Sequence, residues 1–152
     1  MTEYFEDLEN VVPNTPVTKI PMITNIGKNP CYVRALVKIV NPEGQVVEGQ
    51  KVQPDLLTIE DLGINGEDWY IGDTRADGYT EVYYQQVLTS VNEAILFRGF
   101  TIPNWNNSVA DKSLSIDIKA EAIQSERFDP IRDKKTDQII SWDEQDIIEY
   151  QE

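Results

Sequence analysis

Residues 113–122 read Ser-Leu-Ser-Ile-Asp-Ile-Lys-Ala-Glu-Ala, and apolar and polar side chains alternate along most of this stretch. Alternate positions share one face of a β-strand. The apolar face carries Leu114, Ile116, Ile118, Ala120 and Ala122, and the polar face carries Ser115, Asp117, Lys119 and Glu121. The stretch therefore predicts a strand whose apolar face is buried and whose polar face contacts solvent.

A second strong strand is predicted from Cys31 to Val40. One face carries Val33, Ala35, Val37 and Ile39, and the other carries Tyr32, Arg34, Leu36 and Lys38. The turn residues Asn41-Pro42-Glu43-Gly44 follow directly. Residues 45–48 then read Gln-Val-Val-Glu, which predicts the return strand of a hairpin.

Shorter strands are predicted on both sides of this region. Residues 17–25 form one that Pro21 interrupts, and because proline cannot donate a backbone hydrogen bond, this strand should lie at an edge or carry a bulge. Residues 68–72, 79–88 and 94–100 fit further strands, although 82–88 could instead close as a helical turn. Many short strands with regular turns predict an all-β fold, an antiparallel β-sandwich with short helical or irregular insertions.

Composition divides the chain into three parts. Residues 1–16 form an acidic N-terminal arm, and residues 17–125 form the sandwich domain. Residues 126–152 form an acidic C-terminal extension, which is either a hairpin or helix packed on the sandwich or a mobile tail that meets a partner. The arm carries apolar residues among its acids: Tyr4, Phe5, Leu8, Val11 and Val12.

The charge balance disfavours two classes of partner. The 152 residues carry a formal net charge of −14. Nucleic acids and anionic membrane surfaces both need clustered Lys and Arg, so neither is expected to bind. No apolar run is long enough to cross a bilayer, and the acidic start of the chain shows no signal peptide, as in a mature secreted domain.

The chain has no histidine, and this excludes the commonest catalytic sites. Neither a Ser-His-Asp triad nor the His-Glu-x-x-His zinc motif can be built. We therefore expect no enzyme, no cofactor and no metal, and a paired-carboxylate hydrolase is the least favoured alternative. The single cysteine, Cys31, cannot form an internal disulfide and is expected to be a small buried residue.

Three stretches occur in an order that resembles one protein family. The first runs from Val17 to Arg34 and includes Lys19-Ile20-Pro21, Thr24-Asn25-Ile26-Gly27 and Cys31-Tyr32-Val33-Arg34. The second contains Tyr83-Tyr84-Gln85-Gln86-Val87-Leu88, then Leu96-Phe97, then Ile102-Pro103-Asn104-Trp105. The third is residues 116–125, with Ala120-Glu121-Ala122-Ile123-Gln124 at its centre. Over residues 17–125 this succession is similar to that of TasA/camelysin-type proteins, which depend on the signal peptidase SipW.

The resemblance implies a jelly-roll-like sandwich that is secreted into the extracellular matrix or held at the cell surface of a Gram-positive bacterium. It also implies that copies, or a copy and a paralogous subunit, assemble into biofilm-matrix fibres when an N-terminal strand is donated to the next subunit. The arm with Tyr4, Phe5, Leu8, Val11 and Val12 is the candidate donor. A disordered leader, or an arm folded back on its own domain, is the alternative. The metallopeptidase activity catalogued for some members is not expected in a chain without histidine.

A carbohydrate-binding or adhesin-type module is the alternative function. Aromatic side chains on an exposed face can stack on sugar rings. The candidates are Trp69, Tyr70, Tyr79, Tyr83, Tyr84 and Trp105. The same residues would otherwise belong to the core and its rim.

Overall fold

The computed structural model describes residues 3–9, 14–42, 46–47, 49–51, 56–103, 113–126 and 128–142. Within these ranges the chain is built from antiparallel strands, and the one helical element is the 3₁₀ turn η1 (Ile59–Leu62). The predicted all-β antiparallel fold class is confirmed. No described helix is both long and apolar enough to cross a membrane.

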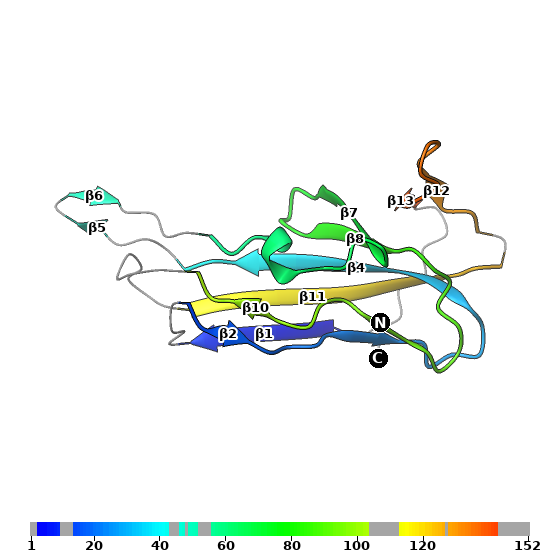
Figure 1. Cartoon of the computed structure of the whole chain (residues 1–152), viewed down its shortest axis with the longest axis horizontal. Coiled ribbons are helices and arrows are strands. Elements are labelled where there is room, and N and C mark those ends of the chain that lie inside the picture. The colour runs from blue at the N-terminus through cyan, green and yellow to red at the C-terminus, as the bar shows by residue number, and fades with distance from the viewer. Residues whose placement is uncertain are drawn as a thin grey trace.

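Two long strands form the centre of the molecule. They are β11 (Ser113–Gln124) and β4 (Cys31–Val40), which pair antiparallel. β4 has the predicted bounds, and β11 runs two residues further than predicted. β1 (Glu3–Glu9) lies beside β11, whereas β8 (Thr80–Tyr84) and then β7 (Trp69–Thr74) lie beside β4. The result is a five-stranded sheet in the order β1-β11-β4-β8-β7 (Figure 1).

A two-stranded ribbon forms a second layer against this sheet. β3 (Met22–Thr24) pairs with β9 (Glu93–Ile95), and β2 (Pro16–Val17) pairs with β10 (Phe100–Thr101). Residues 18–21 interrupt the ladder between the two pairs. In the described part of the chain the ribbon strands pair on one side only, as predicted for a strand that contains Pro21.

The core lies between the sheet and the ribbon. It buries the predicted apolar face of β11 and the apolar face of β4, apart from the half-buried Ile39 and Ala122. Trp69 on β7 crosses the core and donates its indole N–H to the carbonyl of Ile95, at 2.9 Å. The ribbon side of the core contains Ala94, Leu96, Phe97, Phe100 and Ile102.

The predicted return strand at residues 45–48 is wrong. β5 (Val46–Val47) pairs with β6 (Gln50–Lys51) and not with β4. β4 pairs with β11 along its whole length on one side, whereas β8 pairs only with residues 34–37 on the other side. Figure 1 shows β5 and β6 beyond the end of β4, away from the sheet, so they do not lie along its free stretch. The chain is instead held at the end of β4 by Asn41, whose side chain accepts a hydrogen bond from the Leu57 N–H (2.8 Å) and donates one to the Leu57 carbonyl (3.0 Å).

Two further strand predictions are corrected in detail. The stretch 82–88 forms no helical turn, because β8 continues to Tyr84 and Leu88 then makes an isolated antiparallel bridge to Cys31. The stretch 94–100 is not one strand. It divides into β9 and β10, and Gly99 between them approaches the opposite strand so closely that a Cβ atom would lie 2.6 Å from the Val17 carbonyl oxygen.

The described part of the C-terminal extension is a hairpin that packs on the outer face of the five-stranded sheet. β12 (Ile131–Arg132) pairs with β13 (Ile139–Ser141), and β13 contacts β7 and β8. Phe128, Ile139 and Trp142 are buried there in a second, smaller core. Residues 143–152 lie outside the described residues. The hairpin therefore covers part of the sheet face that the ribbon does not cover.

Candidate functional site

The candidate assembly strand, β1, lies at the edge of its own sheet. Among the described strands it pairs with β11 alone, from Glu3 opposite Lys119 to Glu9 opposite Ser113. Tyr4, Phe5 and Leu8 of the predicted arm belong to this strand. Val11 and Val12 lie outside the described residues. The arm is thus held by its own domain in this structure.

The register of β1 determines which of its residues stand opposite core residues of β11. Tyr4 stands opposite Ile118 and Leu8 opposite Leu114, and both partners on β11 are buried core residues. Glu6 stands opposite Ile116, another core position. Phe5 and Asp7 fall on the other face, opposite Asp117 and Ser115. β1 thus has an acid opposite a core residue of β11, and its sequence is less apolar than that of β4 or β11.

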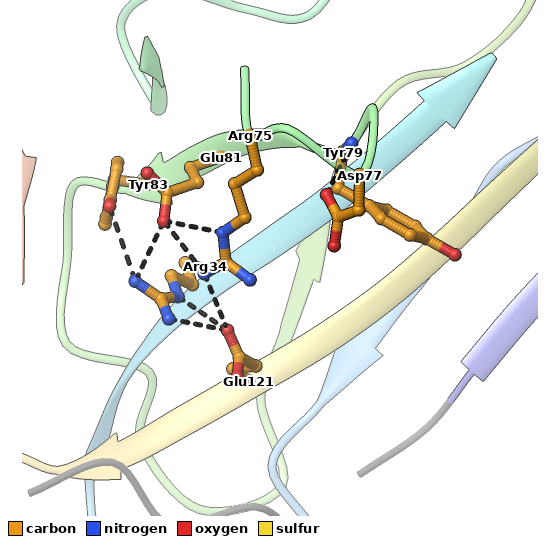
Figure 2. Close-up of polar contacts among 7 residues, drawn as sticks. All are labelled: Arg34, Arg75, Asp77, Tyr79, Glu81, Tyr83 and Glu121. Carbon is orange, nitrogen blue, oxygen red and sulfur yellow. Dashed lines mark hydrogen bonds and ion pairs between the residues drawn. The ribbon is translucent and has the colours of Figure 1, made fainter. Parts of the chain in front are cut away.

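A buried charged cluster lies on the outer face of the same sheet. Its centre is Arg34 on β4, which is 1% exposed. The guanidinium Nε donates to Glu121 Oε1 at 2.7 Å, and Nη2 lies 2.7 Å from the same oxygen. Nη1 reaches Glu81 Oε2 at 3.3 Å and the Tyr83 hydroxyl at 3.4 Å (Figure 2).

Arg75 completes the cluster from the turn between β7 and β8. Its Nη2 lies 2.9 Å from Glu81 Oε2 and 3.7 Å from Glu121 Oε1. Two guanidinium groups therefore face two carboxylates, and the four charges balance (Figure 2). Balanced pairing of this kind is what allows charged side chains to be buried.

The cluster changes the pKa of its members in directions that follow from burial and pairing. Burial lowers the pKa of Arg34, but hydrogen bonding and charge attraction from Glu121 outweigh it, and the net pKa lies above its ordinary value. Burial, followed by the negative charge of Glu81, raises the pKa of the Tyr83 phenol. Both shifts favour the protonated forms, a cationic guanidinium and a neutral phenol.

The C-terminal hairpin covers this cluster. Trp142 places its ring centroid 4.8 Å from the Arg34 guanidinium carbon, within the range of a cation–π interaction. Phe128 and Tyr83 pack edge-to-face on Trp142, each with its ring centroid 5.9 Å away. The Gln85 side chain extends the attachment, because it donates to the Ile139 carbonyl (2.8 Å) and accepts from the Ile139 N–H (2.7 Å). The charged cluster therefore anchors the extension.

The expectation that the polar face of β11 contacts solvent is wrong at Glu121, which is only 7% exposed. Arg34, which shares the second face of its strand with Tyr32, Leu36 and Lys38, is buried as well. Trp142 packs over Arg34 and lies far along the chain, so alternation within one strand could not reveal this burial. The available signal was the pairing of opposite charges at facing positions of two predicted strands, together with aromatic residues in an acidic extension.

The aromatic residues proposed for sugar stacking are mostly not on an open face. Trp69 and Tyr83 are each 1% exposed and belong to the two cores. Tyr70, Tyr79 and Tyr84 are half-buried, and Tyr79 donates its hydroxyl hydrogen to Asp117. Trp105 lies outside the described residues. In the described part of the chain these side chains do not form one exposed stacking surface.

No group of three or more Cys, Asp or Glu side chains suited to a metal ion occurs among the described residues. Cys31 is buried at the start of β4, where burial raises the pKa of its thiol. A high thiol pKa leaves little of the reactive thiolate. Comparison with models of protein families, with curated proteins and with solved structures found no match to this chain.

Proposed function

We propose that this chain is a secreted structural protein of a bacterial cell surface or biofilm matrix, with a jelly-roll-like sandwich, whose copies assemble into fibres by strand donation. β1 is the donated strand and the outer edge of β11 is the acceptor. The proposal assigns no catalysis to the chain. Its partner is a second copy or a paralogous subunit.

The observation that best supports this proposal is the position of β1. It is a terminal strand at a sheet edge, and β11 is its only strand partner in the described part of the chain. If β1 leaves, β11 presents a row of unpaired backbone groups, which is the surface that accepts an added strand. The same residue pairs can then form between two copies, because the donated strand and the acceptor edge are identical in every copy.

The composition of β1 supports exchange. Four of its seven residues are acidic: Glu3, Glu6, Asp7 and Glu9. One of them, Glu6, stands opposite the buried Ile116. Such a strand gains less from burial than a fully apolar one. Its acids also oppose uncontrolled edge-to-edge pairing of the finished sheet.

A disulfide at facing positions tests the proposal directly. Asp7 and Ser115 stand opposite each other on the outer face of the sheet. Facing residues of antiparallel strands are about 4.5–5.5 Å apart at Cα, within disulfide range. In a Cys31→Ala background, Asp7→Cys and Ser115→Cys in one chain should lock β1 in place, so the oxidised protein should form no fibres by electron microscopy and reduction should restore them.

The same positions report donation between copies. A chain with Asp7→Cys alone, mixed with a chain with Ser115→Cys alone, should give a disulfide-linked heterodimer as fibres form. Gln124→Cys, an exposed position at the other end of β11, is the matched control and should not link to Asp7→Cys. Fibres that still grow from the locked protein would refute strand donation by β1.

A further inference from the structure

The two ends of β11 lie beside different parts of the chain. At the Ser113 end, β1 finishes at Glu9 and the chain re-enters the described structure at Asn14. At the opposite end, Gln124 pairs with Cys31, and the turn that precedes Cys31 lies beside the turn at residues 88–92. Figure 1 shows these two turns at the right-hand end, with β1 finishing toward the left.

The turns at the Gln124 end form what we call the apolar tip, defined by Ile26 and Val91. Their side chains are 82% and 81% exposed, the highest values among the exposed large hydrophobic residues of the described chain. The two residues lie on turns that hydrogen bonds join, so both exposed side chains belong to the same small region of surface. Exposed apolar patches on a protein surface commonly mark interaction sites.

Hydrogen bonds hold the apolar tip in one shape. The Val91 N–H donates to the Asn25 carbonyl at 2.8 Å, and the Asn25 N–H donates to the Asn92 carbonyl at 3.1 Å. The Ser90 hydroxyl donates to the Gly27 carbonyl at 2.6 Å. Val91 itself has a φ of 59°, which is unfavourable for a β-branched residue. The fold therefore keeps an exposed valine in a strained conformation, a feature associated with binding elements.

The length of the connection to β1 limits how donation can join two copies. Four residues, 10–13, separate Glu9 from Asn14. Fully extended, the five steps from Glu9 to Asn14 reach about 17 Å. β11 has 12 residues and is about 40 Å long. A strand donated in the observed register must therefore join two copies near their Ser113 ends, and reciprocal donation closes a pair.

We infer that the apolar tip is a second self-association surface, which joins two copies tip to tip about a two-fold axis. This inference rests on the proposed function, because it supplies the contact that turns closed pairs into a continuing fibre. Two different contacts at opposite ends of a subunit generate a linear polymer. Ile26 and Val91 of one copy cover those of the other and remove all four side chains from water.

The charges around the tip are self-complementary, which selects a second copy as the occupant. Lys28 is exposed on one turn, and Glu93 is exposed where β9 leaves the other. A two-fold axis places Lys28 of each copy toward Glu93 of the other. An anionic lipid surface would instead meet both charge signs here and a net charge of −14 over the whole chain.

The first test separates the tip contact from strand donation. Val91→Asn removes the apolar group and suits a positive φ, and Ile26→Asp places a charge at the contact. In both variants the disulfide between Asp7→Cys of one copy and Ser115→Cys of another should still form. Electron microscopy and sedimentation should, however, show pairs of copies in place of fibres. Ile131→Asp, at a 47% exposed position on the C-terminal hairpin, is the matched control and should leave fibre length unchanged.

The second test locates the contact. Ile26→Cys, in the Cys31→Ala background, should form a disulfide between the two copies' equivalent cysteines. Lys28→Glu should shorten fibres, and adding Glu93→Lys should restore them. The inference is wrong if fibres of the Val91→Asn and Ile26→Asp variants keep their length, or if Ile26→Cys links instead to Leu56→Cys in the groove lined by Val17, Phe100 and Ile102. Binding of the wild-type protein to phosphatidylcholine vesicles that is lost in Ile26→Asp would overturn it in favour of a lipid surface.

If the link between Asp7→Cys and Ser115→Cys fails in Cys31→Ala chains that keep Ile26 and Val91, the proposed function is wrong. A tip-to-tip disulfide could still form in that case. The two readouts therefore report the two contacts separately.

Discussion

Arg34 and Glu121 stand at facing positions of β4 and β11, and the guanidinium Nε and Nη2 both lie 2.7 Å from Glu121 Oε1. Their side chains are 2% and 8% exposed, so the pair is shielded from solvent. Removing one member of such a pair leaves a buried charge without its main partner, which costs far more than the loss of a surface ion pair.

Glu121→Ala should therefore lower the free energy of unfolding by about 3 kcal/mol, measured by urea denaturation. Glu121→Gln should cost less, because the amide oxygen can still accept from Arg34. Glu126→Ala is the control at an exposed position just after β11 and should change stability by less than about 0.5 kcal/mol. Equal effects of Glu121→Ala and Glu126→Ala would contradict a buried ion pair.

Gln85→Ala should release the C-terminal hairpin without unfolding the sandwich. The substitution removes both hydrogen bonds between the Gln85 side chain and the Ile139 backbone, and each is worth about 1 kcal/mol. Hydrogen exchange at the Ile139 amide should become about tenfold faster or more, since 1.4 kcal/mol is a factor of ten in the opening equilibrium. The neighbouring Gln86 is exposed, and Gln86→Ala should leave that rate unchanged.

Gly99→Ala should destabilise the ribbon. Its Cβ would lie 2.6 Å from the Val17 carbonyl oxygen, so β2 and β10 would have to separate. We expect a loss of about 1–3 kcal/mol in thermal or urea unfolding. Gly66→Ala meets no atom within 4 Å and should be nearly neutral. A Gly99→Ala protein as stable as Gly66→Ala would show that this close approach is absent in solution.

Tyr83 should make stability depend on alkaline pH. Burial raises the pKa of its phenol above the ordinary value of 10.0, so the folded-state pKa exceeds the unfolded one. The contribution is fully present below about pH 10 and is lost as the pH rises through the folded-state pKa. In an absorbance titration of tyrosinate, Tyr83→Phe should lack one late-titrating group. The same titration in urea should show no late group in either protein.

The two longest strands were predictable because their own residues determine them. β11 alternates over a length at which chance alternation is rare, and in both strands the predicted apolar face lies in the core apart from the half-buried Ile39 and Ala122. Pro21 likewise predicted the interruption at residues 18–21, because a proline has no N–H to donate to a neighbouring strand. These features depend on properties of consecutive residues.

The pairing of strands was harder to predict, because it depends on competition between distant segments. Residues 45–48 were expected to pair with β4, but Val46 and Val47 pair with β6, and β4 takes its partners β11 and β8 from distant parts of the chain. The charged cluster was hard to predict for the same reason. Arg34, Glu81 and Glu121 come from three strands, and Trp142, which packs over Arg34, comes from the C-terminal extension. The arm at residues 3–9 could be recognised as extended, whereas its pairing with β11 could not.

The interrupted ribbon limits where insertions and deletions can occur in the sequence. Val17 pairs with Phe100, and Met22 pairs with Ile95. The two strands have the same number of residues between these pairs, so the register of the ribbon is the same on both sides of the interruption at residues 18–21. Deleting one residue from 18–21 alone would turn β3 over and expose Ile23, because side chains alternate between faces. Deleting one residue from 96–99 as well would restore the match. Homologous chains should therefore gain or lose residues in these two segments together, as correlated insertions and deletions in an alignment.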